Sequence, residues 1–156
     1  MRLFVALGRL ALPAALAVLV GAGCTGGLFS ERDRLKTALE EFNEGLRWGK
    51  VDAAASHLTI PERQPFAERF GAVADDLEIV EYEVQRIQWN REKGTAEVRL
   101  SLSWSSKRRG LVDKTILEQH WEDVHGGWFV TRQKRLSGTP LPLLDIGIGT
   151  IDDIKK

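Results

Sequence analysis

The sequence contains one cysteine and has no net charge, because 22 Lys and Arg side chains balance 22 Asp and Glu. One cysteine excludes an internal disulfide, and zero net charge excludes the strongly basic surface with which many proteins bind nucleic acid. The 15 Gly and 5 Pro in 156 residues are too few for a collagen-like chain. What is present, 43% hydrophobic and 28% charged residues, is typical of a globular protein. We therefore expect a folded protein without a nucleic-acid partner.

The first 24 residues differ from the rest. Arg2 and Arg9 are their only charged residues, no acidic residue precedes Glu31, and residues 10–20 are apolar apart from Pro13. A short basic start followed by an apolar stretch predicts a secretory signal, and the stretch after Arg9 is short for a membrane span. An uncleaved signal anchor, or an ordinary signal in which the single cysteine has no role, is the alternative.

The end of this segment, Val20-Gly21-Ala22-Gly23-Cys24, resembles the lipobox of bacterial lipoproteins, although Gly21 stands where that family usually has Leu or another aliphatic residue. The resemblance implies cleavage before Cys24 and a diacylated sulfur, with chains such as palmitate. Several acyl chains would hold the protein on a membrane that one chain would bind only reversibly. Because Thr25 and not Asp follows the cysteine, the same resemblance implies a lipid anchor in the cell envelope, at the outer membrane facing the periplasm.

The chain then divides into four predicted segments. Residues 1–23 are the signal peptide, 24–29 the lipidated N-terminus and tether, 30–136 one folded domain, and 137–156 a loosely ordered tail. Pro140 and Pro142 interrupt regular structure in that tail, and its isoleucines follow no sustained period. After cleavage the chain would be long enough for one hydrophobic core and too short for two.

Apolar residues at helical spacing predict a first helix from Ser30 to Trp48, with Ser30 and Asp33 as a capping box. A shorter second helix is expected from Val51 to Leu58. A third should begin around Thr59-Ile60-Pro61 and Pro65 and end near Asp76.

After Leu77 the apolar period changes to two, which predicts strands. The alternation slips by one residue between Val84 and Ile87, as at a β-bulge. Three further strands are predicted at about 95–104, 111–124 and 128–136, and the connections between strands are short. Helices followed by a four-stranded antiparallel meander predict an α+β fold, with the helices on one face of a curved sheet.

This layout resembles the nuclear transport factor 2-like superfamily, whose sheet curls around its longest helix to form a cone. The resemblance is carried by the first helix, by Val51-Asp52-Ala53-Ala54-Ala55, and by Glu118-Gln119-His120-Trp121 followed by Gly126-Gly127-Trp128. It implies relatives of two kinds: small exported lipoproteins of unassigned role, and enzymes such as ketosteroid isomerases and polyketide cyclases. The enzymes place an Asp or Tyr base inside the cone.

Five residues on the predicted strands are candidates to line a pocket in the cone: Tyr82, Trp104, Gln119, Trp121 and Trp128. Tyr82 is the only tyrosine, and it could donate a hydrogen bond into such a cavity. The alternative is that all these side chains fill the core, since small domains use large aromatic residues for this purpose.

Other polar groups carry weaker hypotheses. Glu118, His120 and Glu122 share one strand face and are metal-compatible, but they read more simply as the solvent side of a strand, so no metal or cofactor is predicted. His125 falls in a turn with Gly126 and Gly127. The basic loop of Lys107, Arg108 and Arg109 fits a solvated turn or a contact with an anionic surface.

No nucleophile–base pair and no phosphate-binding loop is recognisable. The sequence therefore favours a membrane-anchored, non-enzymatic binding or assembly module for a partner protein or an apolar ligand. A small enzyme of the isomerase or cyclase type is the alternative.

Overall fold

The computed structural model describes residues 30–143. The predicted signal and tether, with Cys24, lie outside the described residues, and so do residues 144–156. The described chain forms three helices followed by four strands: α1 (Glu31–Arg47), α2 (Val51–Ser56), α3 (Ile60–Val73), β1 (Leu77–Asn90), β2 (Thr95–Ser106), β3 (Leu111–Val124) and β4 (Gly127–Gly138).

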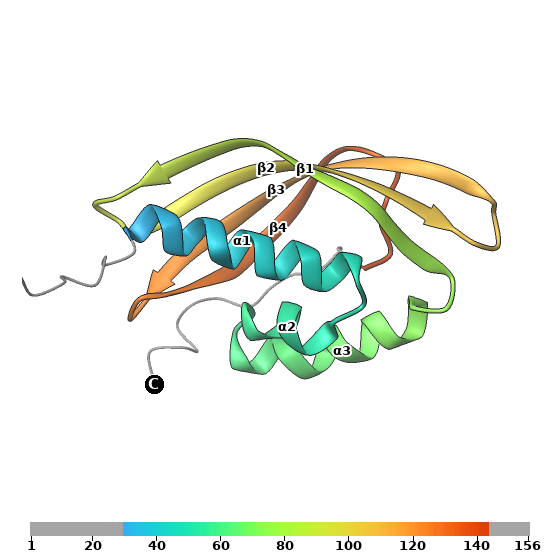
Figure 1. The fold of residues 1–156 in the computed structure, drawn as a ribbon, viewed down its shortest axis with the longest axis horizontal. Coiled ribbons are helices and arrows are strands. Elements are labelled where there is room, and N and C mark those ends of the chain that lie inside the picture. The colour runs from blue at the N-terminus through green and yellow to red at the C-terminus, as the bar shows by residue number, and fades with distance from the viewer. Residues whose placement is uncertain (1–29, 144–156) are drawn as a thin grey trace, which may run out of the picture.

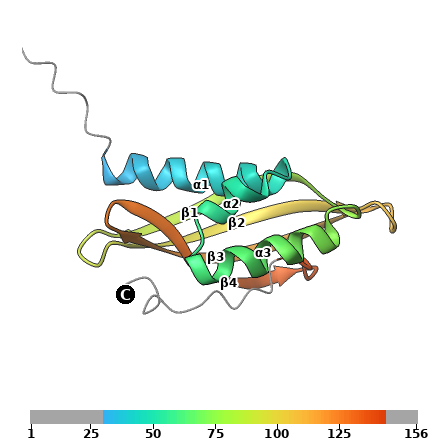
Figure 2. The same cartoon turned by 90° about the horizontal axis from the view of Figure 1, so that it is seen from below.

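The four strands form one antiparallel sheet in the order β1-β2-β3-β4, and the helices cover one of its faces (Figure 1). Seen from below, α1 and α3 lie side by side across the sheet, with α2 between them (Figure 2). This confirms the predicted α+β fold, with helices packed on a curved four-stranded meander.

The start of α1 has the predicted capping box. The Ser30 hydroxyl accepts a hydrogen bond from the Asp33 backbone N–H at 3.2 Å, and the Asp33 carboxylate accepts one from the Ser30 backbone N–H at 3.2 Å. The hydroxyl and backbone N–H of Ser30 lower the pKa of Asp33. The predicted apolar face of α1 is buried, namely Leu35, Ala38, Leu39, Phe42 and Leu46. Sequence patterning thus places α1 to within a residue at each end.

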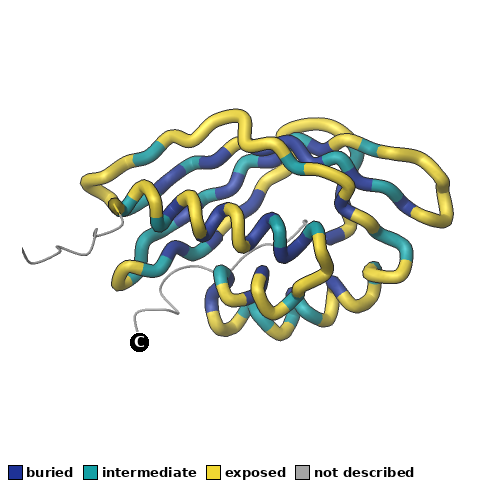
Figure 3. Tube along the Cα trace, in the orientation of Figure 1, coloured by how far each residue is buried: buried dark blue, intermediate teal, exposed yellow. Residues whose placement is uncertain are grey.

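The bulge predicted in β1 is present, and a second one accompanies it. Pairing with β2 shifts between Val84 and Arg86, and also between Ile79 and Glu81. The second shift removes Val80 from the inner face, where the simple alternation places it, and leaves it 42% exposed. Much of β1, an edge strand, is exposed, and Figure 3 shows this strand mainly in the colour of exposed residues.

The central strands β2 and β3 supply most of the core on the sheet side. Alternate residues of β2 are buried, as predicted, from Ala96 to Trp104. On β3 the buried residues are Thr115, Leu117, Gln119 and Trp121, so His120 points to the opposite face.

The folded domain extends beyond Leu136, where the sequence placed its end. Strand β4 continues to Gly138, and the backbone N–H of Thr139 donates to the carbonyl of Lys114 at 3.0 Å. Leu141 and Leu143 are then buried, at 2% and 1% exposure. The first residues of the predicted tail therefore belong to the core, because they bring two leucines into it despite the flanking prolines.

Candidate functional site

Close packing of α2 on α1 sets the position of His57, which caps the end of α2. At Gly45 a Cβ atom would lie 2.8 Å from the Ala54 backbone nitrogen, so a side chain at this position would push the helices apart. The next segment is fixed to β4, because the Val130 N–H donates to the carbonyl of His57 at 2.9 Å. His57 is thereby held between α1 and the β3–β4 hairpin.

The imidazole of His57 lies between two acceptors. Its Nε2 is 2.9 Å from the Glu41 carboxylate, and its Nδ1 is 3.2 Å from the backbone carbonyl of Trp128. The ring can donate to both only when each nitrogen carries a proton. The ring also lies against Trp121, with ring centroids 6.2 Å apart and the ring planes inclined at 57°. His57 therefore joins a helix, a strand and the core.

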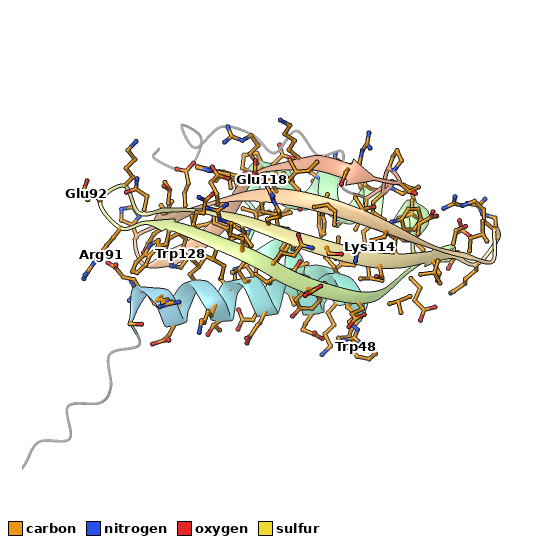
Figure 4. All side chains as sticks on the ribbon, turned by 90° about the horizontal axis from the view of Figure 1, so that it is seen from above. Trp48, Arg91, Glu92, Lys114, Glu118 and Trp128 are labelled. Atoms are coloured by element: carbon orange, nitrogen blue, oxygen red, sulfur yellow. The ribbon has the colours of Figure 1, made fainter. Side chains whose placement is uncertain are left out.

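A cleft of about 280 Å³ opens beside this histidine. One wall is α1, another is His57, and the third is the β3–β4 hairpin; the lining residues are Arg34, Thr37, Ala38, Glu41, His57, Gly126, Gly127 and Trp128. Figure 4 shows Trp128 near the end of the molecule where α1 begins, with Arg91 and Glu92 of the β1–β2 turn. The cleft thus lies at the end of the domain where α1 begins.

The hairpin wall is shaped by a tight turn. Val124 pairs with Gly127, and the two residues between them, His125 and Gly126, have φ angles of 53° and 87°. Two positive φ angles are typical of the turns that close two-residue hairpins. The Asp123 carboxylate accepts from the Gly126 N–H at 2.8 Å and pairs with Arg34 at 3.5 Å. One aspartate therefore both stabilises the turn and holds the arginine of the cleft.

Two hydrogen-bond donors on residues that line this cleft have no acceptor among the described residues. They are Arg34 Nε and the indole Nε1 of Trp128, and both atoms are buried. A buried donor without an acceptor costs about 1–3 kcal/mol. Both belong to residues that line the cleft, so an acceptor on a bound molecule could satisfy them.

The other buried indoles have acceptors within the chain. Trp121 Nε1 donates to the Gln119 side-chain oxygen at 3.1 Å, and the Gln119 amide donates to Gln133 at 2.8 Å. Trp104 Nε1 donates to the Thr115 hydroxyl at 2.9 Å. Trp128 differs from these two in lacking a partner.

The five residues predicted to line one pocket are not brought together around it. Trp121 and Gln119 are fully buried in the core, Trp104 is 2% exposed, and it borders a separate cleft near Pro140 and Pro142. Of the five, Trp128 lines the cleft beside His57.

Tyr82 lies at the side of α1, where its pKa is raised by partial burial and then by the neighbouring Glu44 carboxylate, to which it is hydrogen-bonded. A raised pKa is the opposite of what a tyrosine base requires at neutral pH.

The other sequence candidates lie away from the cleft. His120 is on the outer face of the sheet, with Nδ1 at 2.6 Å from Glu97 and Nε2 at 3.2 Å from Glu122. Within residues 30–143 no cluster of His, Cys, Asp and Glu has a metal-binding arrangement, and no helix is long and apolar enough to cross a membrane.

The basic loop is held in place by acidic residues. The Arg108 guanidinium is 3.2 Å from Asp76, and the pKa of Asp76 is lowered by hydrogen bonds from the Arg108 backbone N–H and the Ser106 hydroxyl. Arg109 pairs with Asp113 and lies over the Trp104 ring. Internal pairing thus accounts for two of the three basic residues of the loop.

Sequence reasoning missed Arg34, Glu41 and His57 as a group. The two α1 residues are seven apart and share a helix face with Ala38, which was assigned to the core. No local sequence pattern marks His57 as a site residue. Its position at the cleft depends on the packing of α2 against Gly45 and on the hydrogen bond from Val130 of β4.

No model of a known protein family matches the chain, and no curated protein matches it. Solved structures do. A SEC-C motif containing protein from Rhodopseudomonas palustris matches with a TM-score of 0.55 at 10% identity, over 64% of this chain and 77% of that one. A ketosteroid isomerase-like protein from Erwinia carotovora atroseptica matches with a TM-score of 0.52 at 16% identity, over 69% of this chain and 98% of that one. At such identities the likeness shows the fold alone, and it agrees with the α+β arrangement of helices on a curved antiparallel sheet that the sequence predicts.

Proposed function

We propose that the chain is a lipid-anchored module of the bacterial cell envelope that binds a small, uncharged, mostly apolar ligand in the cleft beside His57. The observation that carries the binding site is the unpartnered Trp128 indole N–H at a cleft whose lining is largely apolar. Such a site favours an apolar body with one hydrogen-bond acceptor, such as a carbonyl oxygen.

The charges around the cleft favour an uncharged ligand. Arg34 is already paired with Asp123, and His57 with Glu41, so each basic group has a carboxylate beside it. A carboxylate or phosphate ligand would meet both of these acids. A neutral acceptor would meet no such repulsion.

The place of the cleft also fits an anchor at Cys24. The predicted lipidated N-terminus and tether, residues 24–29, lie between the predicted signal peptide and Ser30, the N-cap of α1. Fully extended, they span at most about 20 Å. An anchored domain would therefore carry its cleft close to the membrane surface, where apolar molecules accumulate.

Ligand binding can be tested through the indole N–H resonances of the ¹⁵N-labelled protein. The matched probes are acetophenone and ethylbenzene, which differ by the carbonyl oxygen. We expect acetophenone to shift the Trp128 indole signal and to bind more tightly by up to about tenfold, the value of one hydrogen bond. In Trp128→Phe that preference should disappear, and in Trp48→Phe, which alters an exposed ring, it should remain. Equal binding of the two probes by the unmodified protein would contradict the proposed site.

The anchor is tested separately. The intact mass of the membrane-fraction protein should correspond to a chain that begins at an acylated Cys24, and Cys24→Ser should leave an unlipidated precursor. A different mature N-terminus, or no acyl mass, would contradict the lipoprotein proposal and leave the ligand proposal standing.

An isomerase-like enzyme is the second candidate, and the His57–Glu41 pair is the observation that favours it, because carboxylate-paired histidines act as bases in many enzymes. Against it, Nδ1 faces a backbone carbonyl and Nε2 faces the carboxylate, so neither nitrogen is left for a substrate. The buried residues within 30–143 also include no ionisable side chain. If His57→Gln folds normally and still binds acetophenone but fails to complement loss of the protein in cells, an enzymatic function is favoured over binding alone.

A further inference from the structure

The sheet has two edges that no other strand covers over most of their length. Strand β1 pairs only with β2 within the described chain, and β4 pairs with β3. The start of β4 is protected, because Leu58 and Val130 form a parallel bridge. Within residues 30–143 no strand pairs with the outer edge of β4 beyond Val130, and Arg132, Lys134 and Arg135 on this stretch are exposed. Exposed edges of this kind are templates for pairing with another strand.

The two edges carry opposite charges. Strand β1 has three exposed acidic residues, Glu78, Glu81 and Glu83, and one basic residue, Arg86. Strand β4 has three exposed basic residues and no acidic one; they are Arg132, Lys134 and Arg135. Among the described residues, Glu81, Glu83 and Lys134 have no ion-pair partner, and Arg132 makes one long contact with Glu97, at 3.7 Å.

The charges also match in face and spacing. Glu81 and Glu83 pair across to Ser103 and Ser101, which places both acids on the face away from the helices. On β4, Arg132 and Lys134 pair across to His120 and Glu118, which lie on that same outer face. Each pair is two residues apart, and the Glu81–Val84 stretch lies between the two bulges of β1, where the strand is regular.

We propose that β1 of one copy pairs with β4 of the next copy, antiparallel, with Glu81 opposite Lys134 and Glu83 opposite Arg132. The direction is already correct, because three antiparallel steps separate β1 from β4 and make the two strands antiparallel within each sheet. A simple translation therefore continues the sheet from copy to copy. Opposite charges directly across a strand pair stabilise it, whereas like charges destabilise it.

The same charges exclude the symmetric alternatives. Pairing β1 with β1 through Glu81 and Glu83 would set acids against acids, and pairing β4 with β4 through Arg132 and Lys134 would set bases against bases. The contact is therefore head-to-tail, and it leaves one free edge at each end of the assembly. Head-to-tail contacts that do not close into a ring form open chains whose length grows with concentration.

Disulfide trapping tests the register. Two full-length chains, both with Cys24→Ser, carry either Glu83→Cys or Arg132→Cys and different affinity tags, and they are mixed and oxidised. Directly opposite Cβ atoms are about 4.5–5.5 Å apart, within reach of a disulfide after small adjustment. We expect mixed dimers and few dimers of either chain with itself. With Gln88→Cys in place of Glu83→Cys, mixed dimers should be rare. Mixed dimers no more abundant than self-dimers would overturn the proposal.

Charge reversal tests the driving force. One variant carries Glu81→Lys and Glu83→Lys, and the other carries Arg132→Glu and Lys134→Glu. In sedimentation velocity at low salt, the average mass of the unmodified full chain should rise with concentration, and the mass of each variant should not. An equimolar mixture should regain association, because each variant then offers an edge that the other can pair with. A mixture that stays dissociated, or an unmodified chain with the mass of one copy up to millimolar concentration, would overturn it.

Discussion

Gly45 on α1 touches α2 at Ala54, and a Cβ atom at position 45 would lie 2.8 Å from the Ala54 backbone nitrogen and 3.0 Å from its Cβ. The first of these contacts is with backbone, which cannot rotate away as a flexible side chain does. The absence of a side chain at Gly45 therefore permits the helix packing that carries His57 to Glu41.

We expect Gly45→Ala to lower the free energy of unfolding by about 1–3 kcal/mol, the usual cost of forcing an extra carbon into a packed interface. Urea unfolding measures it. The matched control is Gly71→Ala in α3, where nothing lies within 4 Å of the added atom. There, alanine should stabilise the helix by about 0.5–1 kcal/mol. Equal effects of the two substitutions would show that α1 and α2 are not in close contact.

Trp121→Ala should destabilise the protein by about 3–5 kcal/mol, as expected for a large buried aromatic residue. Its ring is fully buried, packs edge-on against Phe42 at 5.8 Å, and donates to Gln119. Trp48→Ala is the control, because that ring is 63% exposed. Thermal or urea unfolding should separate the two variants clearly. If the stability of Trp121→Ala were close to that of the unmodified protein, the register of β3 that buries Trp121 would be wrong.

Leu141→Ala should cost about 2–5 kcal/mol, although it lies in a segment whose sequence predicts a loose tail. Leu136→Ala, at a residue 36% exposed and earlier in the chain, should cost less than about 1 kcal/mol. Urea denaturation of both variants provides the comparison. Should the order be reversed, the folded domain would end near Leu136 after all.

Acid should destabilise the protein partly through Asp76. Its folded pKa lies below the ordinary value of 3.8, so the unfolded chain binds a proton first. The contribution of Asp76 is therefore complete above pH 3.8 and is lost as the pH falls through the folded pKa. In Asp76→Asn, stability measured by urea unfolding should change less with pH below 3.8 than in the unmodified protein. An unchanged slope would mean that the contacts with Arg108 and Ser106 are absent in solution.

Local patterns predicted the parts of this fold that depend on neighbouring residues. The Ser30–Asp33 capping box, the apolar face of α1 and the alternation in β2 each involve residues a few positions apart, so their signals are visible in the sequence. The bulge after Val84 was visible for the same reason, because it shifts the apolar alternation.

Features that depend on distant contacts were not predictable in this way. Leu141 and Leu143 are buried, although the prolines beside them suggested irregular structure. His57 reaches Trp128, 71 residues away, through packing that no local period reveals. The second bulge in β1, which exposes Val80, could not be predicted either, because the apolar residues around it keep a period of two in the sequence.

The bridge between Leu58 and Val130 has a consequence for the order of events during synthesis. Chains emerge from the N-terminus, and domains generally fold as units as they are made. Leu58, which follows α2, can form this bridge only after β4 has been synthesised. Leu141 and Leu143, which complete the core, are synthesised later still. Until those residues emerge, the apolar faces of the helices and of β2 have no complete partner. The core of this domain is therefore completed only after Leu143 has emerged, and until then its apolar faces are accessible to whatever binds unfolded chains.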